Sequence, residues 1–347
     1  MKEKSLNSEE SKEKEKEGIF WNTFWFLCII VSIILVIASC FFINDFNTNI
    51  KKYNINYPWP KLTDLIPSLY LLPIIICFKL FIEFLFKGFV ESCLSKKYKQ
   101  PHLKELGDKY RKKLARHIYK IIFYTGITIF GYYVLKDLPY FPKSMGGKGY
   151  MPEMFLSGFP NSYFHEKPQL FDFYYNINLA YFECDFIFLL ICERQSDFLN
   201  MFTHHICTIF LIIFSFITNY SNIGSLVIFC HMESDILLHL ERFLLQTDQS
   251  VFVLTIVGII FVSNFIYMRQ YVFGDMIYTI YKYITWNWGI ITTMLWLFLV
   301  ILYIMHLRWS YILLYKTSEL VFQKKRIADD IKFDELLNEK KNKKHIN

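Results

Sequence analysis

Residues 204–238 have the sequence HHICTIFLIIFSFITNYSNIGSLVIFCHMESDILL. Two apolar runs in this stretch are separated by the polar residues 219–222, which predicts two antiparallel segments joined by a short turn. Because the hydrocarbon region of a bilayer holds no water, a spanning run must satisfy its backbone amides internally, as an α-helix does. The stretch therefore predicts a transmembrane helical hairpin.

Apolar runs of similar length recur along the whole chain of 347 residues. Hydrophobic residues make up 54% of the sequence and charged residues only 20%, which is typical of membrane proteins and excludes a disordered chain. The runs predict an all-α fold, a polytopic transmembrane helical bundle of about eight spans. They are residues 18–43, 64–90, 118–135, 171–191, 201–218, 223–245, 251–273 and 288–315.

Basic residues cluster in the N-terminal tail, in the segment between the second and third runs, and in the C-terminal tail. With eight spans these segments share one face of the membrane, and the positive-inside rule predicts that both termini are cytosolic. The net charge of +7 is thereby explained by topology, and no nucleic-acid partner is expected. The expected organisation is a charged tail (1–17), an extra N-terminal transmembrane helix (18–43), one bundle (64–316) and a basic tail (317–347).

Ionisable side chains inside the runs mark candidate functional positions, because a charge at mid-bilayer costs roughly 2.5 to 3.5 kcal/mol. The fifth run carries one polar stripe at helical spacing, with His205 as a second imidazole beside it; the stripe is His204, Thr208, Ser215 and Asn219. The sixth run carries a second stripe, composed of His231, Asp235, His239 and Arg242. Since the two runs form a hairpin, we expect the histidine pair to face His239 and Asp235.

Three interpretations of these stripes are open from the residues themselves. An imidazole oriented by a carboxylate is a general base, or itself an acyl acceptor. The same histidines and aspartate supply enough ligands for a metal ion, although the HExxH spacing is missing. The polar groups also suit a purely structural role, bonding across helices to hold the bundle together.

Other polar features are weaker. Lys79 and Glu83 are spaced four apart and predict an ion pair. Four more charged or imidazole residues are candidates for lining a cavity or, equally, for a structural contact: Glu183 and Asp185 in the fourth run, Arg269 in the seventh and His306 in the eighth. The segment GGKG at residues 146–149 lacks the spacing of a phosphate-binding P-loop and predicts a flexible loop.

The stretch 204–238 resembles the longevity-assurance motif of ceramide synthases in the TLC-domain family. The resemblance rests on the double histidine and on residues at matching intervals after it: Thr208, Ser215, Asn219, Gly224, His231, Ser234 and Asp235. Outside the motif it is supported by KLFIE at 79–83, KDLPYF at 136–141, Arg269, and MHLRWSY at 305–311. It implies a TLC-type bundle over about residues 64–316, preceded by an extra span.

The resemblance implies an endoplasmic-reticulum membrane enzyme that transfers a fatty acyl group from acyl-CoA to the amine of a sphingoid base, giving (dihydro)ceramide. His204 and His205 would act as base or transient acyl acceptor, and Asp235 would orient an imidazole. Supporting or substrate-binding roles fall to His231, Glu233, Thr208, Ser215, Asn219, His239, Arg269 and His306. The last loop, about 274–288, would set the acyl-chain length.

The implied partners are fatty acyl-CoA as co-substrate, a sphingoid base, the lipid bilayer, and a second subunit in a homo- or heterodimer. No metal and no further cofactor are expected. Met232 departs from the family pattern, because the family has an acidic residue there, and Glu233 is the obvious substitute. Two rival hypotheses follow: a non-catalytic TLC-domain protein that binds or senses a lipid, and a transporter, which the absence of repeat symmetry in the sequence disfavours.

Overall fold

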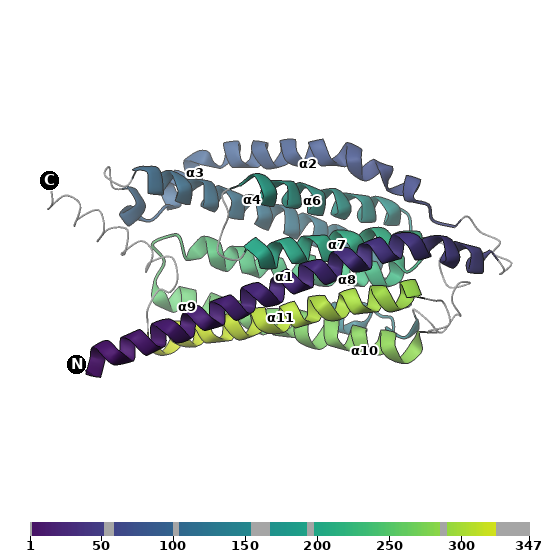
Figure 1. Cartoon of the computed structure of the whole chain (residues 1–347). Coiled ribbons are helices and arrows are strands. Elements are labelled where there is room, and N and C mark those ends of the chain that lie inside the picture. The colour runs from purple at the N-terminus through teal and green to yellow at the C-terminus, as the bar shows by residue number, and fades with distance from the viewer. Residues whose placement is uncertain are drawn as a thin grey trace. The chain divides into compact units, whose positions relative to one another are not determined.

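The computed structural model describes residues 2–51, 59–99, 104–153, 167–192, 198–284 and 290–323, and every named element in these ranges is a helix (Figure 1). The fold class predicted from the apolar runs is therefore confirmed. The helices are α1 (Lys2–Ile50), η1 (Leu62–Leu65), α2 (Ile66–Leu85), α3 (Lys87–Cys93), η2 (Lys96–Lys99), α4 (Lys104–Leu135), η4 (Lys143–Met145), α6 (Phe171–Ile191), α7 (Phe198–Ile217), α8 (Ser221–Leu244), α9 (Val251–Ile266), η6 (Tyr267–Val272), α10 (Phe273–Tyr283) and α11 (Ile290–Gln323).

Seven of these helical segments are long and apolar enough to cross a membrane, so the chain is a multi-pass membrane protein. The spans are Phe26–Ile50, Leu62–Leu85, Gly107–Leu135, Phe198–Ile217, Ser221–Leu244, Val251–Tyr283 and Ile290–Phe322. The remaining predicted span is the 21-residue helix α6. Its apolar content is lower because Asp172, Glu183 and Asp185 lie within it.

Three boundaries differ from the sequence-based expectation. Helix α1 runs from the predicted charged tail through the first span without a break. Helix α4 begins at Lys104, inside the predicted basic loop, because its first turns are polar but are rich in the good helix formers Lys, Glu, Leu and Arg. The predicted loop after Phe273 is instead helix α10 up to Tyr283. Residues 285–289 and most of the predicted C-terminal tail lie outside the described residues.

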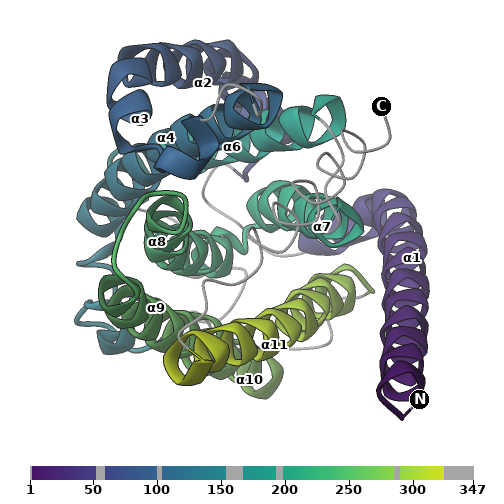
Figure 2. The same ribbon diagram turned by 90° about the vertical axis from the view of Figure 1, so that its left-hand side faces the viewer.

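The chain divides into two compact units. The first unit comprises residues 1–75, 134–227 and 275–305, and the second comprises 76–133, 228–274 and 306–347. In the first unit α7 packs against both α1 and α6 (Figure 2). Phe210 of α7 packs against Phe298 of α11 with 4.2 Å between the centroids of the two tilted rings, and Trp59 Nε1 donates to the carbonyl of Ile217 at 3.0 Å.

In the second unit, α9 contributes a core of Phe261, Val262 and Phe265. The predicted pair of Lys79 and Glu83 is confirmed, with 3.3 Å between Nζ and Oε1. At the start of α4 the Arg111 guanidinium donates to Glu91 at 2.5 Å, and this hydrogen bond lowers the pKa of the Glu91 carboxyl.

Candidate functional site

The double histidine lies two turns into α7, in the first unit, and both imidazoles are buried. His205 Nε2 lies 3.6 Å from Oδ2 of Asp185 on α6, within ion-pair distance but longer than a hydrogen bond. The rings of Phe182 and Phe186 flank His205 at centroid distances of 6.3 and 6.2 Å. The histidine pair is thus held in an aromatic, water-poor environment with a carboxylate on one side.

Thr208 lies one helical turn after His204, and its side chain is also buried. Its hydroxyl has no hydrogen-bond partner among the described residues. A buried hydroxyl normally has a hydrogen-bond partner, because burying it without a hydrogen bond costs about 1 to 3 kcal/mol. The Thr208 hydroxyl is therefore available to a bound molecule next to the histidines.

Helix α6 is fixed against α7 by a hydrogen bond between two hydroxyls. Tyr175 Oη and Ser215 Oγ are 2.7 Å apart, and both side chains are buried. Gly224 of α8 faces this bond, and a Cβ there would collide with the Tyr175 hydroxyl and approach Ser215 Oγ to 2.5 Å. Ser215 therefore sets the position of α6, which is the helix that carries Asp185.

Asn219 does not lie on the helical stripe that the sequence predicts. Helix α7 ends at Ile217, and Asn219 occupies the turn before α8 with a φ of 61°. Asparagine is one of the few residues other than glycine that adopts this left-handed conformation readily. Its role is to reverse the chain between α7 and α8.

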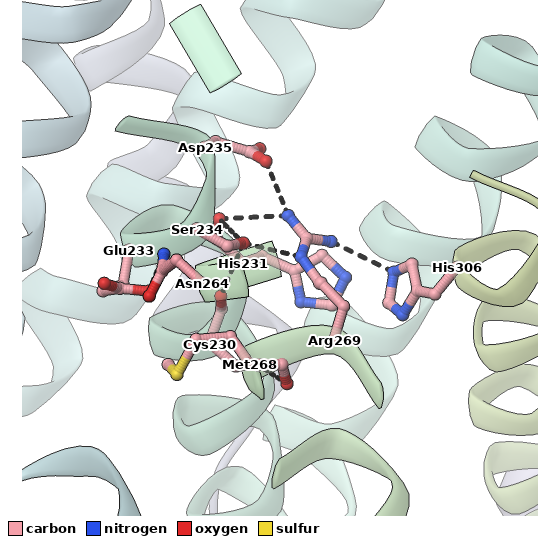
Figure 3. A network of polar contacts seen from close by, with 9 residues as sticks. All are labelled: Cys230, His231, Glu233, Ser234, Asp235, Asn264, Met268, Arg269 and His306. Carbon is pink, nitrogen blue, oxygen red and sulfur yellow. Dashed lines mark hydrogen bonds and ion pairs between the residues drawn. The ribbon is translucent and has the colours of Figure 1, made fainter. Parts of the chain in front are cut away.

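In the second unit Arg269 forms the centre of a polar network that Figure 3 shows. Its side chain is 2% exposed. It donates to Asp235 Oδ1 at 2.7 Å, to Ser234 Oγ at 2.6 Å and to the His231 carbonyl at 3.1 Å, all on α8. The fourth partner is Nε2 of His306 on α11, 3.0 Å from Nη1.

The network fixes the tautomer of the His306 imidazole. A guanidinium only donates hydrogen bonds, so Nε2 of His306 accepts and the proton of this neutral ring is on Nδ1. The His306 ring packs near the rings of His231 and Phe273, with centroids 5.0 Å away in each case. The network thereby connects α8 and α11 through the π-helical turn η6, which carries Arg269.

Glu233 is turned away from this network, as Figure 3 shows, and it accepts a hydrogen bond of 3.1 Å from Asn264 Nδ2. Met232, which precedes Glu233 in the sequence, is buried and 1% exposed. Sequence reasoning did not single out Asn264. A polar amide within the apolar seventh run was the available signal.

His239 pairs with a histidine that sequence reasoning also missed. The Nδ1 atoms of His117 on α4 and His239 on α8 are 3.0 Å apart, and both rings are buried. Tyr124 stacks on His239 with an interplanar angle of 8°. The pair is a proton-sharing contact between helices.

The predicted residues fall into separate groups. The histidine pair, Thr208, Ser215 and Asn219 belong to the first unit, whereas the second unit contains His231, Glu233, Asp235, His239, Arg269 and His306. The carboxylate seen beside the histidine pair is Asp185, and the partner seen for Asp235 is Arg269. Among the described residues no group of three or more His, Cys, Asp or Glu side chains has a metal-binding arrangement.

The spanning helices and the polar networks inside them define a polytopic α-helical membrane protein with a site within the membrane region. Residues 113–315, more than half of the chain, match the TLC domain. The chain belongs to the TLC-domain family.

Known proteins similar to this chain include ceramide synthase hyl-1 of Caenorhabditis elegans, which is 24% identical over 60% of this chain and 58% of the relative. Sphingosine N-acyltransferase lag1 of Schizosaccharomyces pombe is 25% identical over 58% of this chain and 49% of the relative. Ceramide synthase 5 of Mus musculus is 29% identical over 46% of this chain and 39% of the relative. The chain spans about half the length of the curated relatives it matches.

Proposed function

We propose that this chain is a ceramide synthase, a transferase that moves a fatty acyl group from acyl-CoA to the amine of a sphingoid base. The observation that carries the proposal is a buried double histidine with a carboxylate 3.6 Å away, inside a TLC domain. Relatives named ceramide synthase and sphingosine N-acyltransferase in three organisms support it.

In the proposed reaction the sphingoid amine attacks the thioester carbonyl, so that a C–N bond forms and the C–S bond breaks. One neutral imidazole of the pair His204 and His205 takes the amine proton and passes it to the departing CoA thiolate. Asp185 stabilises the imidazolium that forms while the proton is held. In the alternative, covalent mechanism, the same imidazole first accepts the acyl group from the thioester and then transfers it to the amine.

The remaining residues have supporting roles in this proposal. Thr208 offers its hydroxyl to a substrate oxygen, one turn from His204. Arg269 holds Asp235 and His306 in fixed positions, and His231 packs against them. No metal or further cofactor enters the reaction. We place the protein in the endoplasmic reticulum membrane with both termini cytosolic, and we expect it to form a homo- or heterodimer.

A second candidate function is a non-catalytic TLC-domain protein that binds or senses a lipid. It is favoured by the buried position of Met232, which holds no acidic group. The neighbouring carboxylate of Glu233 accepts a hydrogen bond from Asn264 instead. This candidate predicts saturable binding of a lipid without turnover. Activity would then appear only in a Met232→Asp variant.

The test is acyl transfer from a mixture of acyl-CoA chain lengths to dihydrosphingosine, in membranes that contain the wild type or a double variant. His204 and His205 are replaced together by Ala, and together by Gln, which keeps polarity and size but is not a base. Thermal unfolding of the purified proteins shows whether each variant is folded.

Product from the wild type and none from either double variant supports the enzyme. Wild-type activity in the double variants rejects the histidine assignment. Absence of product from a folded wild type rejects the acyltransferase, and activity of Met232→Asp in that case assigns the defect to this position.

A further inference from the structure

A cavity of about 500 Å³ lies in the first unit between the loop 142–152 and helix α10. Three lysines and three tyrosines are among its lining residues: Lys143, Lys148, Lys282, Tyr150, Tyr278 and Tyr283. Asp275 is the one carboxylate in the lining. The ammonium groups outnumber it by three to one, so the cavity favours an anion.

One wall of the cavity is the GGKG segment, which is a closed turn and not the predicted flexible loop. Gly149 N donates to the Phe141 carbonyl at 2.8 Å, and Gly147 N donates to that of Pro142 at 3.0 Å. A Cβ at Gly147 or Gly149 would collide with the Phe141 or Pro139 carbonyl oxygen. Only glycine fits these positions, and the tight turn fixes the backbone that carries Lys148.

These hydrogen bonds also determine how the turn can recognise a ligand. In a P-loop the backbone N–H groups point at the phosphate. Here the N–H groups of Gly146, Gly147 and Gly149 are used within the loop itself. Recognition therefore rests on the lysine ammonium groups and the tyrosine hydroxyls.

The opposite wall is one face of helix α10. Asp275, Tyr278, Thr279 and Lys282 follow each other at intervals of three, one and three residues, so they share a face of the helix. Thr279 is buried at the base of this face, and Tyr278 is 61% exposed. This wall of the cavity therefore has a buried hydroxyl at its base and an exposed aromatic ring at its edge.

The span that ends in α10 is longer than the hydrocarbon core of a bilayer is thick. The span Val251–Tyr283 has 33 residues. At 1.5 Å per residue it measures about 50 Å, whereas the core of a bilayer is about 30 Å thick. Tyr271, Tyr278 and Tyr281 are exposed along this part of the helix, as is typical of residues at the headgroup level.

We propose that this cavity binds the phosphate of an anionic phospholipid headgroup, through Lys143, Lys148, Lys282 and the neighbouring tyrosine hydroxyls. Its volume falls in the range of small-molecule sites, so it accommodates a headgroup and not only a free ion. In this proposal the headgroup enters the cavity while the acyl chains of the lipid remain in the bilayer. Lipid binding at this site is measured directly, so its test does not depend on activity.

The experiment uses the full chain in nanodiscs of phosphatidylcholine with or without 20% phosphatidic acid, followed by native mass spectrometry to count retained lipid. The test variant is Lys148→Gln with Lys282→Gln. The matched control is Lys51→Gln with Lys61→Gln, which removes two exposed lysines that do not line the cavity. A parallel arm adds inorganic phosphate to the protein in detergent.

Retention of phosphatidic acid over phosphatidylcholine by the wild type and the control, reduced about tenfold or more in the test variant, is the expected result. Equal retention by all three proteins overturns the proposal. Binding of millimolar inorganic phosphate by the protein in detergent, with no selection between lipids in the nanodiscs, also overturns it and assigns the cavity to a soluble phosphate.

Discussion

The guanidinium of Arg269 donates a hydrogen bond of 2.7 Å to Asp235, and the arginine side chain is almost completely buried. The three other hydrogen bonds of this guanidinium go to Ser234, the His231 carbonyl and His306, so its charge is compensated by groups from two other helices. Removing one partner of such a buried ion pair strongly destabilises the protein, because the other charge is left without compensation.

Replacing Arg269 by Met should therefore destabilise the protein by about 3 kcal/mol or more. Thermal unfolding in a fixed detergent measures the effect. Arg242→Met is the matched control, because Arg242 lies on the same side of α8 as Asp235 but is exposed. Equal unfolding temperatures for the two variants would contradict a central role of Arg269.

The double variant Arg269→Met with Asp235→Asn should be less destabilised than the sum of the two single variants, since it leaves no lone buried charge. The same unfolding measurement on the four proteins of this cycle gives the coupling energy. A coupling energy near zero would show that Asp235 is compensated by another group.

Substituting Gly224 by Ala should destabilise the protein by roughly 1 to 3 kcal/mol, because the new methyl group collides with the hydroxyl of Tyr175. Gly126 provides the control within a helix, since a Cβ there meets nothing within 4 Å. Gly126→Ala should stabilise by roughly 0.5 to 1 kcal/mol through helix propensity. A lower unfolding temperature for Gly224→Ala and a higher one for Gly126→Ala, each relative to wild type, would confirm the packing argument. Two stabilised variants would refute it.

The backbone conformation at Asn219 predicts that replacement by Gly destabilises the protein less than replacement by Val. Asn219→Gly should unfold close to the wild-type temperature, and Asn219→Val should lose about 1 to 2 kcal/mol because a β-branched residue is strained at a φ of 61°. The reverse order, with Gly more harmful than Val, would show that the amide side chain matters more than the turn.

Asp185→Asn should lower kcat/KM for acyl transfer by at least about tenfold, because the charge beside His205 is lost while the shape is kept. Asp172→Asn on the same helix is the control, since its carboxylate pairs with Lys167 near the surface and should leave turnover unchanged. Equal activity of the two variants would remove Asp185 from the reaction and leave the histidines to act without it.

The sequence by itself determined the class of the fold. Predominantly apolar runs of about eighteen or more residues must form helices in a bilayer, so the spans followed from length and composition alone. The polar interruption at residues 219–222 likewise predicted the break between α7 and α8. The i, i+4 spacing of Lys79 and Glu83 predicted their ion pair, because both residues are on one helix and the period fixes the contact.

Contacts between helices were decided only by the tertiary structure. Helical periodicity places His205, Asp235 and His239 on a face of their helix, but it does not say which helix that face meets. The partners turned out to be Asp185, Arg269 and His117, each from another helix. The closed GGKG turn was missed for the same reason, since its glycines are required by carbonyl groups that approach only after the chain has folded.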